Sequence, residues 1–243
     1  MGKTILITGA STGIGAATAR RFAAGNQVIV HYHSSSVAAE QVAADVVRAG
    51  GTAHLARANL ATEAGCRDLA SFAAETCDRL DVLVNNTGSL VRRCPARQLE
   101  WQLMLDTFAL NTFSTMMMSS LCIPLLERGE HPCIVNVTSI AVRHGAPSAT
   151  IYGAAKGALD TFTRGLAKEL APTIRVNAVA PGVIDTPFHA RVTTPEKMAE
   201  FKASTPLKRV GQPEEIAAAI AFLVDNLFMT GETLDVNGGW FMR

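Results

Sequence analysis

TGASTGIG, residues Thr8 to Gly15, places three glycines within seven residues near the start of the chain. It follows TILIT (residues 4–8), a short apolar and β-branched run typical of a strand buried on both faces of a parallel sheet, and it precedes residues 16–24, which read as a helix. A loop between a strand and a helix can bring backbone N–H groups and the positive end of the helix dipole against a phosphate. The stretch therefore predicts a phosphate-binding loop, with a tight glycine-rich turn without a ligand as the alternative.

Each of these glycines has an expected task. Gly9 and Gly13 would keep the loop open to a ligand, and Gly15 would let the following helix pack closely on the sheet. Their spacing, G-x3-G-x-G, differs from the G-x-G-x-x-G of the general dinucleotide fingerprint. The glycine spacing alone therefore does not identify the ligand of this loop.

The composition favours one α/β domain over residues 1–243. With 243 residues, 25.7 kDa and 48% hydrophobic residues, the chain can bury a large core, and no linker divides it. Lysine and arginine number 22 against 21 aspartates and glutamates, so the net charge of +1 indicates neither nucleic acid nor an anionic membrane surface as a partner. A small substrate, neutral or locally recognised, fits this balance better.

The five cysteines form no C-x-x-C pair and show no Cys/His metal spacing. They favour a reduced protein with unpaired thiols and no metal site. The first strand begins near Lys3, which leaves no room for a signal peptide, and no apolar stretch reaches the length of a membrane span. We therefore expect a soluble cytoplasmic protein.

Short β-branched runs alternate with longer alanine-rich stretches along the chain. The expected strands are residues 4–8, 27–32, 52–60, 80–86, 132–139, 174–181 and 231–239. Seven strands with helices between them predict a doubly wound parallel sheet of the Rossmann type. Because ligands bind at the carboxyl ends of the strands in this architecture, the residues just after each strand are the candidate site residues.

Tyr152 and Lys156 lie four residues apart in SATIYGAAKGALDTF, which reads as the start of a helix, so both side chains share one face. An ammonium beside a phenol favours the phenolate, and a tyrosine with a reference pKa of about 10 needs such help to act as an acid or base near neutral pH. Ser139, which ends a predicted strand, can bring a hydroxyl donor to the same carbonyl oxygen. Taken alone, the pair is also typical of an exposed polar helix face.

Six segments resemble, in order and spacing, the short-chain dehydrogenase/reductase family: TGASTGIG, NNTG, Asn111 within FALNTF, VNVTSI, YGAAK and VNAVAPGVIDT. The resemblance runs from Lys3 to about Gly239. The closing segments TGETLDVNGG and PLKRVGQPEEIA also resemble the branch that contains 3-oxoacyl-acyl-carrier-protein reductases and many sugar, polyol and steroid dehydrogenases. The resemblance implies an enzyme that interconverts a ketone and a secondary alcohol by hydride transfer.

The resemblance implies a catalytic role for each of four residues. Tyr152 would be the proton donor or acceptor at the substrate oxygen, and Ser139 would polarise that oxygen. Lys156 would hold the nicotinamide ribose hydroxyls and lower the pKa of the Tyr152 phenol. Asn111 would hold a water that connects Lys156 to solvent, which completes a proton relay.

A nicotinamide dinucleotide is the implied cofactor, its pyrophosphate admitted by the three glycines. Asn85 would lie near the adenosine ribose and Thr186 near the nicotinamide carboxamide. Asn59 replaces the usual Asp and would pair with the adenine amino group through its carbonyl, while Thr87 stands where the family usually has Ala. The full set of implied cofactor contacts is Gly9, Ser11, Thr12, Gly13, Ile14, Gly15, Tyr32, His33, Ser34, Asn59, Leu60, Asn85, Gly88, Tyr152, Lys156, Pro181, Gly182, Ile184 and Thr186.

The end of the second predicted strand favours NADP(H) over NAD(H). An NAD enzyme of this fold usually carries Asp or Glu about 20 residues beyond the glycines, where it accepts from the ribose and repels a 2′-phosphate. From Gly9 to Ala39 there is no acidic residue; Tyr32 occupies the acidic position, and His33 and the following serines can donate to a phosphate. Against NADP(H), Thr12 stands where NADP-dependent relatives often carry Arg or Lys, and no arginine replaces it nearby.

Residues 187–212 correspond to the region that forms the substrate lid in the family. Arg92, Arg93 and Arg97 follow NNTG and either rim the pocket or are solvated on a surface loop. Neither feature identifies the carbonyl or alcohol substrate. Relatives are usually tetramers built through helix faces and the C-terminal segment, so we expect a homotetramer.

Other classes of protein fit less well. A P-loop nucleotidase needs G-K-[ST] after the glycines, and GIGAAT lacks it. A methyltransferase on the same sheet needs an acidic residue after the second strand to bind the ribose of its cofactor, and this chain has none there. Two alternatives stay open: a sugar, polyol or other small-alcohol dehydrogenase, and a non-catalytic nucleotide-binding scaffold or sensor, although the latter typically loses the Tyr or the Lys.

Overall fold

One parallel sheet organises the molecule. The computed structural model describes residues 2–242, and in it seven strands pair in the order β3-β2-β1-β4-β5-β6-β7. Every neighbouring pair is parallel. The strands are β1 (Thr4–Ile7), β2 (Gln27–Tyr32), β3 (Thr52–Arg57), β4 (Val82–Asn85), β5 (Cys133–Val137), β6 (Arg175–Pro181) and β7 (Thr233–Val236). The predicted doubly wound sheet is confirmed, with each strand ending at or before the residue expected.

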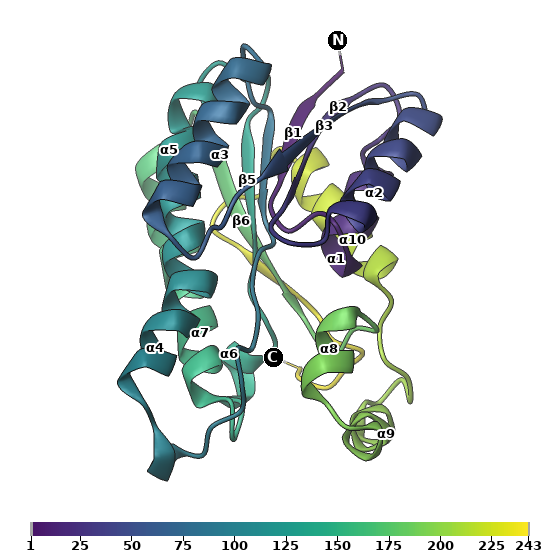
Figure 1. Ribbon diagram of the computed structural model, residues 1–243, viewed down its shortest axis with the longest axis vertical. Helices are drawn as coiled ribbons and strands as arrows, with labels where there is room; N and C mark the ends of the chain where they lie inside the picture. Colours follow the sequence, from purple (N-terminus) through teal and green to yellow (C-terminus); the bar gives the residue numbers. More distant parts are fainter. Residues whose placement is uncertain (1, 243) are drawn as a thin grey trace.

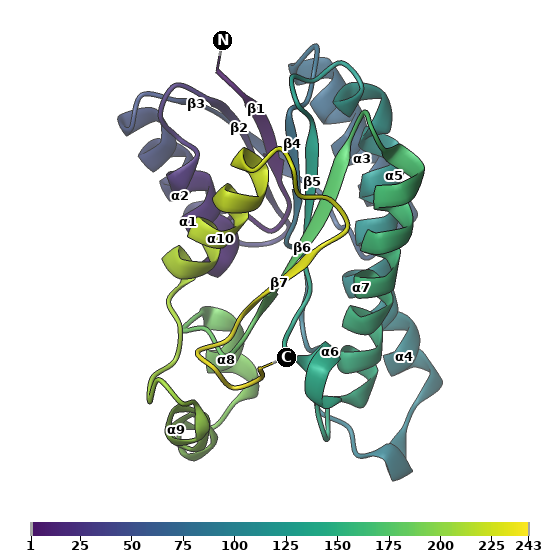
Figure 2. The same ribbon diagram turned by 180° about the vertical axis from the view of Figure 1, so that it is seen from behind.

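Helices cover both faces of this sheet. They are α1 (Gly13–Arg21), α2 (Ser36–Arg48), α3 (Glu63–Thr76), α4 (Trp101–Phe108), α5 (Ser114–Leu126), α6 (Ala141–His144), α7 (Thr150–Leu170), α8 (Pro187–Val192), α9 (Pro195–Ser204) and α10 (Pro213–Asp225). Helices α1, α2 and α10 lie on one face, and α3, α5 and α7 lie on the other (Figures 1 and 2). Helices α6, α8 and α9 gather at the carboxyl ends of the strands (Figure 1).

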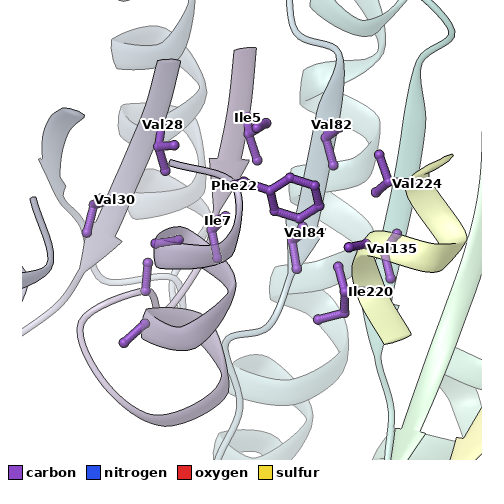
Figure 3. Packing of buried hydrophobic residues seen from close by; sticks show 14 of the residues in the cluster. Ile5, Ile7, Phe22, Val28, Val30, Val82, Val84, Val135, Ile220 and Val224 are labelled. Carbon is purple, nitrogen blue, oxygen red and sulfur yellow. The ribbon is translucent and has the colours of Figure 1, made fainter. Parts of the chain in front are cut away.

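The alternation of side chains along the central strands divides the core in two. Ile5 and Ile7 of β1 belong to the cluster that packs under α1 and α10, whereas Leu6, between them, belongs to the cluster under α3 and α5. Figure 3 shows the first cluster, in which Phe22 and Ile220 close over the sheet. Because both faces are covered, the central strands are mainly apolar, and β1 is buried at every position, which is why TILIT reads as a strand.

The stretch between β4 and β5 departs from expectation. Helices α4 and α5 are joined by a π-helical turn, Ala109–Phe113, into one continuous helix, Trp101–Leu126, of 26 residues, within which an 18-residue window has a mean hydropathy of 1.3. By length and composition alone this helix could cross a membrane, whereas no apolar stretch of that length was expected from the sequence. Half of its most apolar window is buried inside the molecule, as in the core helix of a soluble protein.

Residues 187–212, the segment predicted as a lid, contain α8, α9 and the start of a connection to α10. Pro187 and Pro195 begin the two helices, each after a threonine with extended backbone. An isolated parallel bridge between Ile184 and Gly211 ties the two ends of the segment together. The segment thus leaves the sheet after β6 and returns beside its own starting point.

Candidate active site

A cleft of about 940 Å³ opens at the carboxyl ends of the strands. Its walls come from the loops that follow β1, β2, β4, β5 and β6, from α7, α8 and α9, and from the C-terminal segment. This is the position at which ligands bind in a doubly wound sheet. Among the described lining residues there is no Asp or Glu, whereas Arg93, Lys156 and Lys197 bring positive charge. The cleft therefore favours an anionic ligand.

The glycine loop forms the floor of one end of the cleft. Gly9 and Gly13 have positive φ angles of 64° and 53°, which side chains rarely adopt. A Cβ on Gly13 would lie 3.1 Å from Cγ2 of Thr186, and one on Gly15 would lie 2.3 Å from the carbonyl oxygen of Gly9. The first two keep the loop open and the third allows close packing, as predicted. Gly15 itself does not line the cleft.

The N-terminus of α1 is free to bind an anion. Its N-cap residue, Thr12, has an extended backbone, its side chain makes no capping hydrogen bond, and the first turn holds no acidic residue. Ser11, Thr12, Gly13 and Ile14 all line the cleft. Unsatisfied N–H groups and a helix dipole suit a phosphate group, so this loop fits the pyrophosphate of a dinucleotide.

His31 supports the glycine loop from below. Its Nδ1 accepts the backbone N–H of Gly9 at 2.9 Å, and its Nε2 lies 3.1 Å from the carbonyl oxygen of Ala58. These contacts assign the proton to Nε2, which donates to Ala58. Burial lowers the pKa of His31 to about 4, so the imidazole is neutral near pH 7. Sequence reasoning gave His31 no role, although a histidine at the end of an otherwise apolar strand was the available signal.

The end of β2 leads into the second part of the cleft, which is lined by Tyr32, His33 and Ser34 as expected. Arg57, at the end of β3, pairs in register with Tyr32, and its Nε donates to the carbonyl oxygen of His33 at 3.2 Å. An exposed guanidinium therefore stands beside this loop. Arg57 does not line the cleft, but the register between β2 and β3 brings it beside the loop that follows β2, although the two residues are far apart in the chain.

Ser139, Tyr152 and Lys156 meet at the middle of the cleft. The Ser139 side chain is hydrogen-bonded to the Tyr152 side chain. The ammonium of Lys156 lies 5.9 Å from the centre of the Tyr152 ring and donates to the carbonyl oxygen of Val137 at 2.9 Å. One turn of α7 thus presents a phenol and an ammonium to the end of β5, as their spacing predicts.

The pKa of Tyr152 departs from the expectation of an activated phenolate. Burial raises the pKa of Tyr152 to about 12, and the hydrogen bond from Ser139 offsets only part of this rise. Burial also lowers the pKa of Lys156 to about 8. Burial dominates both pKa shifts, so the phenol keeps its proton at neutral pH.

Asn111 lies in the π-helical turn, fully buried and outside the cleft lining. Its Nδ2 donates to the carbonyl oxygens of Ser89 and Thr107, and its Oδ1 accepts the N–H of Ser89. A Cβ on Gly88 would lie 2.7 Å from Oδ1 of Asn111 and 2.9 Å from Nζ of Lys156. Asn111 and Lys156 are therefore neighbours across Gly88, and the Asn111 amide anchors the backbone that separates them.

Three predicted cofactor contacts do not reach the cleft through their side chains. Asn85 is buried, and its amide donates to Ser119 and to Asn136, which is its in-register partner on β5. The Asn85 side chain therefore faces the helix layer, and Asn86 lines the cleft instead. Asn59 does not line the cleft, since its Oδ1 accepts the N–H of Ala61 in a local turn. Leu60 is buried in the cluster under α3.

Apart from Gly15, the remaining predicted cofactor contacts do line the cleft. They are Gly9, Ser11, Thr12, Gly13, Ile14, Tyr32, His33, Ser34, Gly88, Tyr152, Lys156, Pro181, Gly182, Ile184 and Thr186. Of the three arginines after NNTG only Arg93 lines it, while Arg92 pairs with Glu100 and Arg97 is exposed. Thr87 lines the cleft too, and its buried hydroxyl has no partner within the protein.

The five cysteines are free, as expected. Across residues 2–242 no group of three or more His, Cys, Asp or Glu side chains is placed to hold a metal ion. The chemistry available at the cleft is therefore that of hydroxyl, phenol and ammonium groups beside a site that fits a dinucleotide.

Comparisons with known proteins agree with this geometry. The family profile described as enoyl-(acyl carrier protein) reductase matches residues 9–241. A 3-oxoacyl-[acyl-carrier-protein] reductase of Synechocystis sp. is 38% identical over 98% of this chain and 96% of its own length. The NADH-dependent reductase A1-R′, responsible for alginate metabolism, superposes with a TM-score of 0.91 at 32% identity, covering 100% of this chain and 98% of that one.

A third similar protein carries a bound dinucleotide. The angucycline C-6 ketoreductase LanV, solved with bound NADP, superposes with a TM-score of 0.90 at 30% identity over 99% of this chain and 96% of its own. A1-R′ is NADH-dependent, whereas LanV was solved with bound NADP. The match supports the type of reaction more closely than it supports one substrate.

Proposed function

The chain belongs to the short-chain dehydrogenase/reductase family, and from that premise we propose that it reduces a ketone to a secondary alcohol, using NADP(H), with Tyr152 as the proton donor. The observation that carries this proposal is the meeting of Ser139, Tyr152 and Lys156 in one cleft beside an open glycine loop. A scaffold that only binds nucleotide has no need of this set.

Ser139, Tyr152 and Lys156 have separate roles in the proposed reaction. Ser139 and Tyr152 donate hydrogen bonds to it and stabilise the charge that develops there. Since burial raises the pKa of Tyr152 to about 12, its proton is present at neutral pH and is available to the alkoxide. Lys156 holds the nicotinamide ribose hydroxyls, and Asn111 secures the backbone next to it. The bound cofactor supplies the hydride.

NADP(H) is favoured by the charge of the cleft. A 2′-phosphate meets no acidic residue among the described lining residues, and Tyr32, His33 and Ser34 surround its expected position. Arg57 stands beside the same loop. The NADH dependence of A1-R′ shows that this fold serves both cofactors, so the preference rests on the residues of this chain.

A 3-oxoacyl thioester is the proposed type of substrate, supported by the Synechocystis relative and by a granaticin polyketide synthase putative ketoacyl reductase of Streptomyces violaceoruber. Sugar and polyol oxidation remains the alternative. An acyl carrier protein would be the natural donor of such a thioester. We also propose a homotetramer in the cytoplasm, as in relatives of this family.

The test is oxidation of NADPH, followed by its absorbance, with acetoacetyl thioester, keto-sugar, cyclic ketone and steroid substrates. Turnover of a ketone that depends on Tyr152 supports the proposal. Tight binding of NADPH without turnover of any carbonyl or alcohol would favour a scaffold, and equal turnover by Tyr152→Phe would refute the mechanism.

A further inference from the structure

Six rings form a continuous chain around the end of the cleft that lies beyond the glycine loop. Ring centres are 6.1 Å apart for Tyr152 and Phe188, 5.0 Å for Phe188 and His189, and 6.5 Å for His189 and Phe201. The chain continues from Phe201 to Trp240 at 5.4 Å and from Trp240 to His144 at 5.2 Å. All six residues line the cleft. We call them the ring wall.

The ring wall is assembled from five parts of the chain. His144 ends α6, Tyr152 lies in α7, Phe188 and His189 lie in α8, Phe201 lies in α9, and Trp240 follows β7. Figures 1 and 2 show α6, α8 and the segment that follows β7 close together below the sheet. Aromatic residues make up only 6% of the chain, so their convergence here is a feature of this end of the cleft.

One imidazole of the wall, that of His189, is neutral at neutral pH. Burial, followed by the nearby charge of Arg93, lowers the pKa of His189 to about 4. The Nδ1 atom of His189 lies 3.0 Å from the Thr193 hydroxyl, and Nδ1 of His144 accepts the N–H of Ala146. One nitrogen of each imidazole is thus engaged within its own segment.

Two cations lie beside the wall. The ammonium of Lys197 lies over the Phe201 ring, 5.4 Å from its centre. Arg93 donates to the carbonyl oxygen of Val192 and to the hydroxyl of Ser148. The half-buried side chains of Phe188, Phe201 and Trp240 line the cleft beside these cations and supply its aromatic surface. Flat aromatic groups gain most from such a surface, through offset or edge-to-face contacts.

We propose that the ring wall is a subsite for a flat aromatic substituent carried near the ketone that Tyr152 reduces. The inference deepens the proposed function and rests on it, because Tyr152 is both the proton donor and the first ring of the wall. A substituent attached through one carbon to the carbonyl carbon lies beside Phe188 when the oxygen meets Tyr152 and Ser139. The substrate class is an aryl-bearing 3-oxoacyl thioester or a ketone of the same shape.

Three N-acetylcysteamine thioesters test this subsite: 3-oxo-4-phenylbutanoyl, 4-cyclohexyl-3-oxobutanoyl and acetoacetyl. The methylene group separates the ring from the ketone, so the phenyl and cyclohexyl compounds differ chiefly in flatness and π-character. We expect kcat/KM for the phenyl compound to exceed that for the cyclohexyl compound by about fivefold or more, in line with the worth of aromatic contacts. Against acetoacetyl the advantage should be about tenfold or more, because ring area is also buried.

Variants locate the preference on the wall. Phe201→Leu and Trp240→Leu should each bring the phenyl-to-cyclohexyl ratio toward one, whereas Phe228→Leu, at a fully exposed ring outside the cleft, should leave the ratio as it is. Circular dichroism and NADPH affinity establish that the variants are folded. A ratio that stays unchanged in both wall variants contradicts the inference.

Binding can be read without turnover. The chain has two tryptophans, so Trp101→Phe leaves Trp240 as the only indole, and the 3-oxo-4-phenylbutanoyl thioester should change its fluorescence in the presence of NADP⁺, a pair that cannot react because neither partner supplies a hydride. Turnover of acetoacetyl thioester with equal rates for phenyl and cyclohexyl compounds overturns the ring-wall subsite and leaves the proposed function intact. Absence of turnover for all three, with no fluorescence change, overturns both.

Discussion

The imidazole of His31 holds the backbone N–H of Gly9 at 2.9 Å, so the strand after the glycine loop fixes the loop's first residue. This contact needs an unprotonated Nδ1. A protonated His31 would donate from both nitrogens, and one of these donors would face the N–H of Gly9. Burial lowers the pKa of His31 to about 4, so the ring stays unprotonated and the contact is kept at neutral pH.

Stability should therefore fall on mild acidification. The pKa of His31 is about 4 in the folded chain, below its ordinary value of 6.5. Between pH 6.5 and pH 4 the unfolded chain therefore binds more protons than the folded chain. The free energy of unfolding consequently falls as the pH falls. The contribution of His31 is about 3 kcal/mol between pH 7 and pH 4. Urea denaturation across this range measures it. His31→Gln should flatten the decline, whereas the exposed His33→Gln should retain it; equal slopes in all three proteins would contradict the assignment.

Removing the hydroxyls and the ammonium should have separable effects. Tyr152→Phe should abolish turnover and leave NADPH affinity nearly intact, because the phenol acts at the substrate. Ser139→Ala should lower kcat by roughly 10²-fold, since one donor to the developing alkoxide is lost. Lys156→Ala should impair both turnover and cofactor affinity. Steady-state kinetics and fluorescence titration distinguish these cases, and a Lys156→Ala protein with full affinity would remove Lys156 from the cofactor site.

The two directions of the reaction should respond differently to pH. Reduction needs the protonated phenol, and because burial raises the pKa of Tyr152 to about 12, its kcat should be nearly constant below pH 8 or so. Oxidation needs the phenolate, so its kcat should increase with pH through the alkaline range. Measuring both profiles with one ketone and its alcohol checks this. A reductive rate that already declines near pH 7 would argue against Tyr152 as the donor.

Cofactor preference should follow the charge beside β2. Tyr32→Asp should move the preference toward NADH by about 1 kcal/mol or more, since a carboxylate repels the 2′-phosphate. Arg57→Gln should weaken NADPH binding and leave NADH binding unchanged. Arg67→Gln, at an exposed arginine paired with Glu63 on α3, is the matched control. Titration of each variant with both cofactors decides the matter, and a wild-type preference for NADH would refute the NADP(H) assignment.

Much of this architecture could be predicted from sequence because its causes are local. Strands buried on both faces must be apolar, and glycines are needed where a Cβ would meet Thr186 or the Gly9 carbonyl. The errors have a different cause. Asn85 and Asn86 differ by one position, but successive strand residues face opposite sides of the sheet, so one reaches the helix layer and the other the cleft.

Features built from distant segments could not be predicted in the same way. Arg57 reaches the His33 carbonyl only because β3 pairs with β2 in that register. Trp240 meets Phe201 and His144 only after the C-terminal segment has folded back on the cleft. Composition and spacing carry no record of either contact.

The π-helical turn at Ala109–Phe113 makes the helix Trp101–Leu126 sensitive to its length. An α-helix rotates by about 100° for each residue, and a π turn absorbs one additional residue without breaking the rod. The half before the turn, α4, therefore packs against α7, and the half after it, α5, packs against α3 and β4. Asn111 lies in the turn that joins them. Deleting a single residue here would leave both halves helical but turn one of them away from its partner. This segment consequently tolerates substitution far better than insertion or deletion.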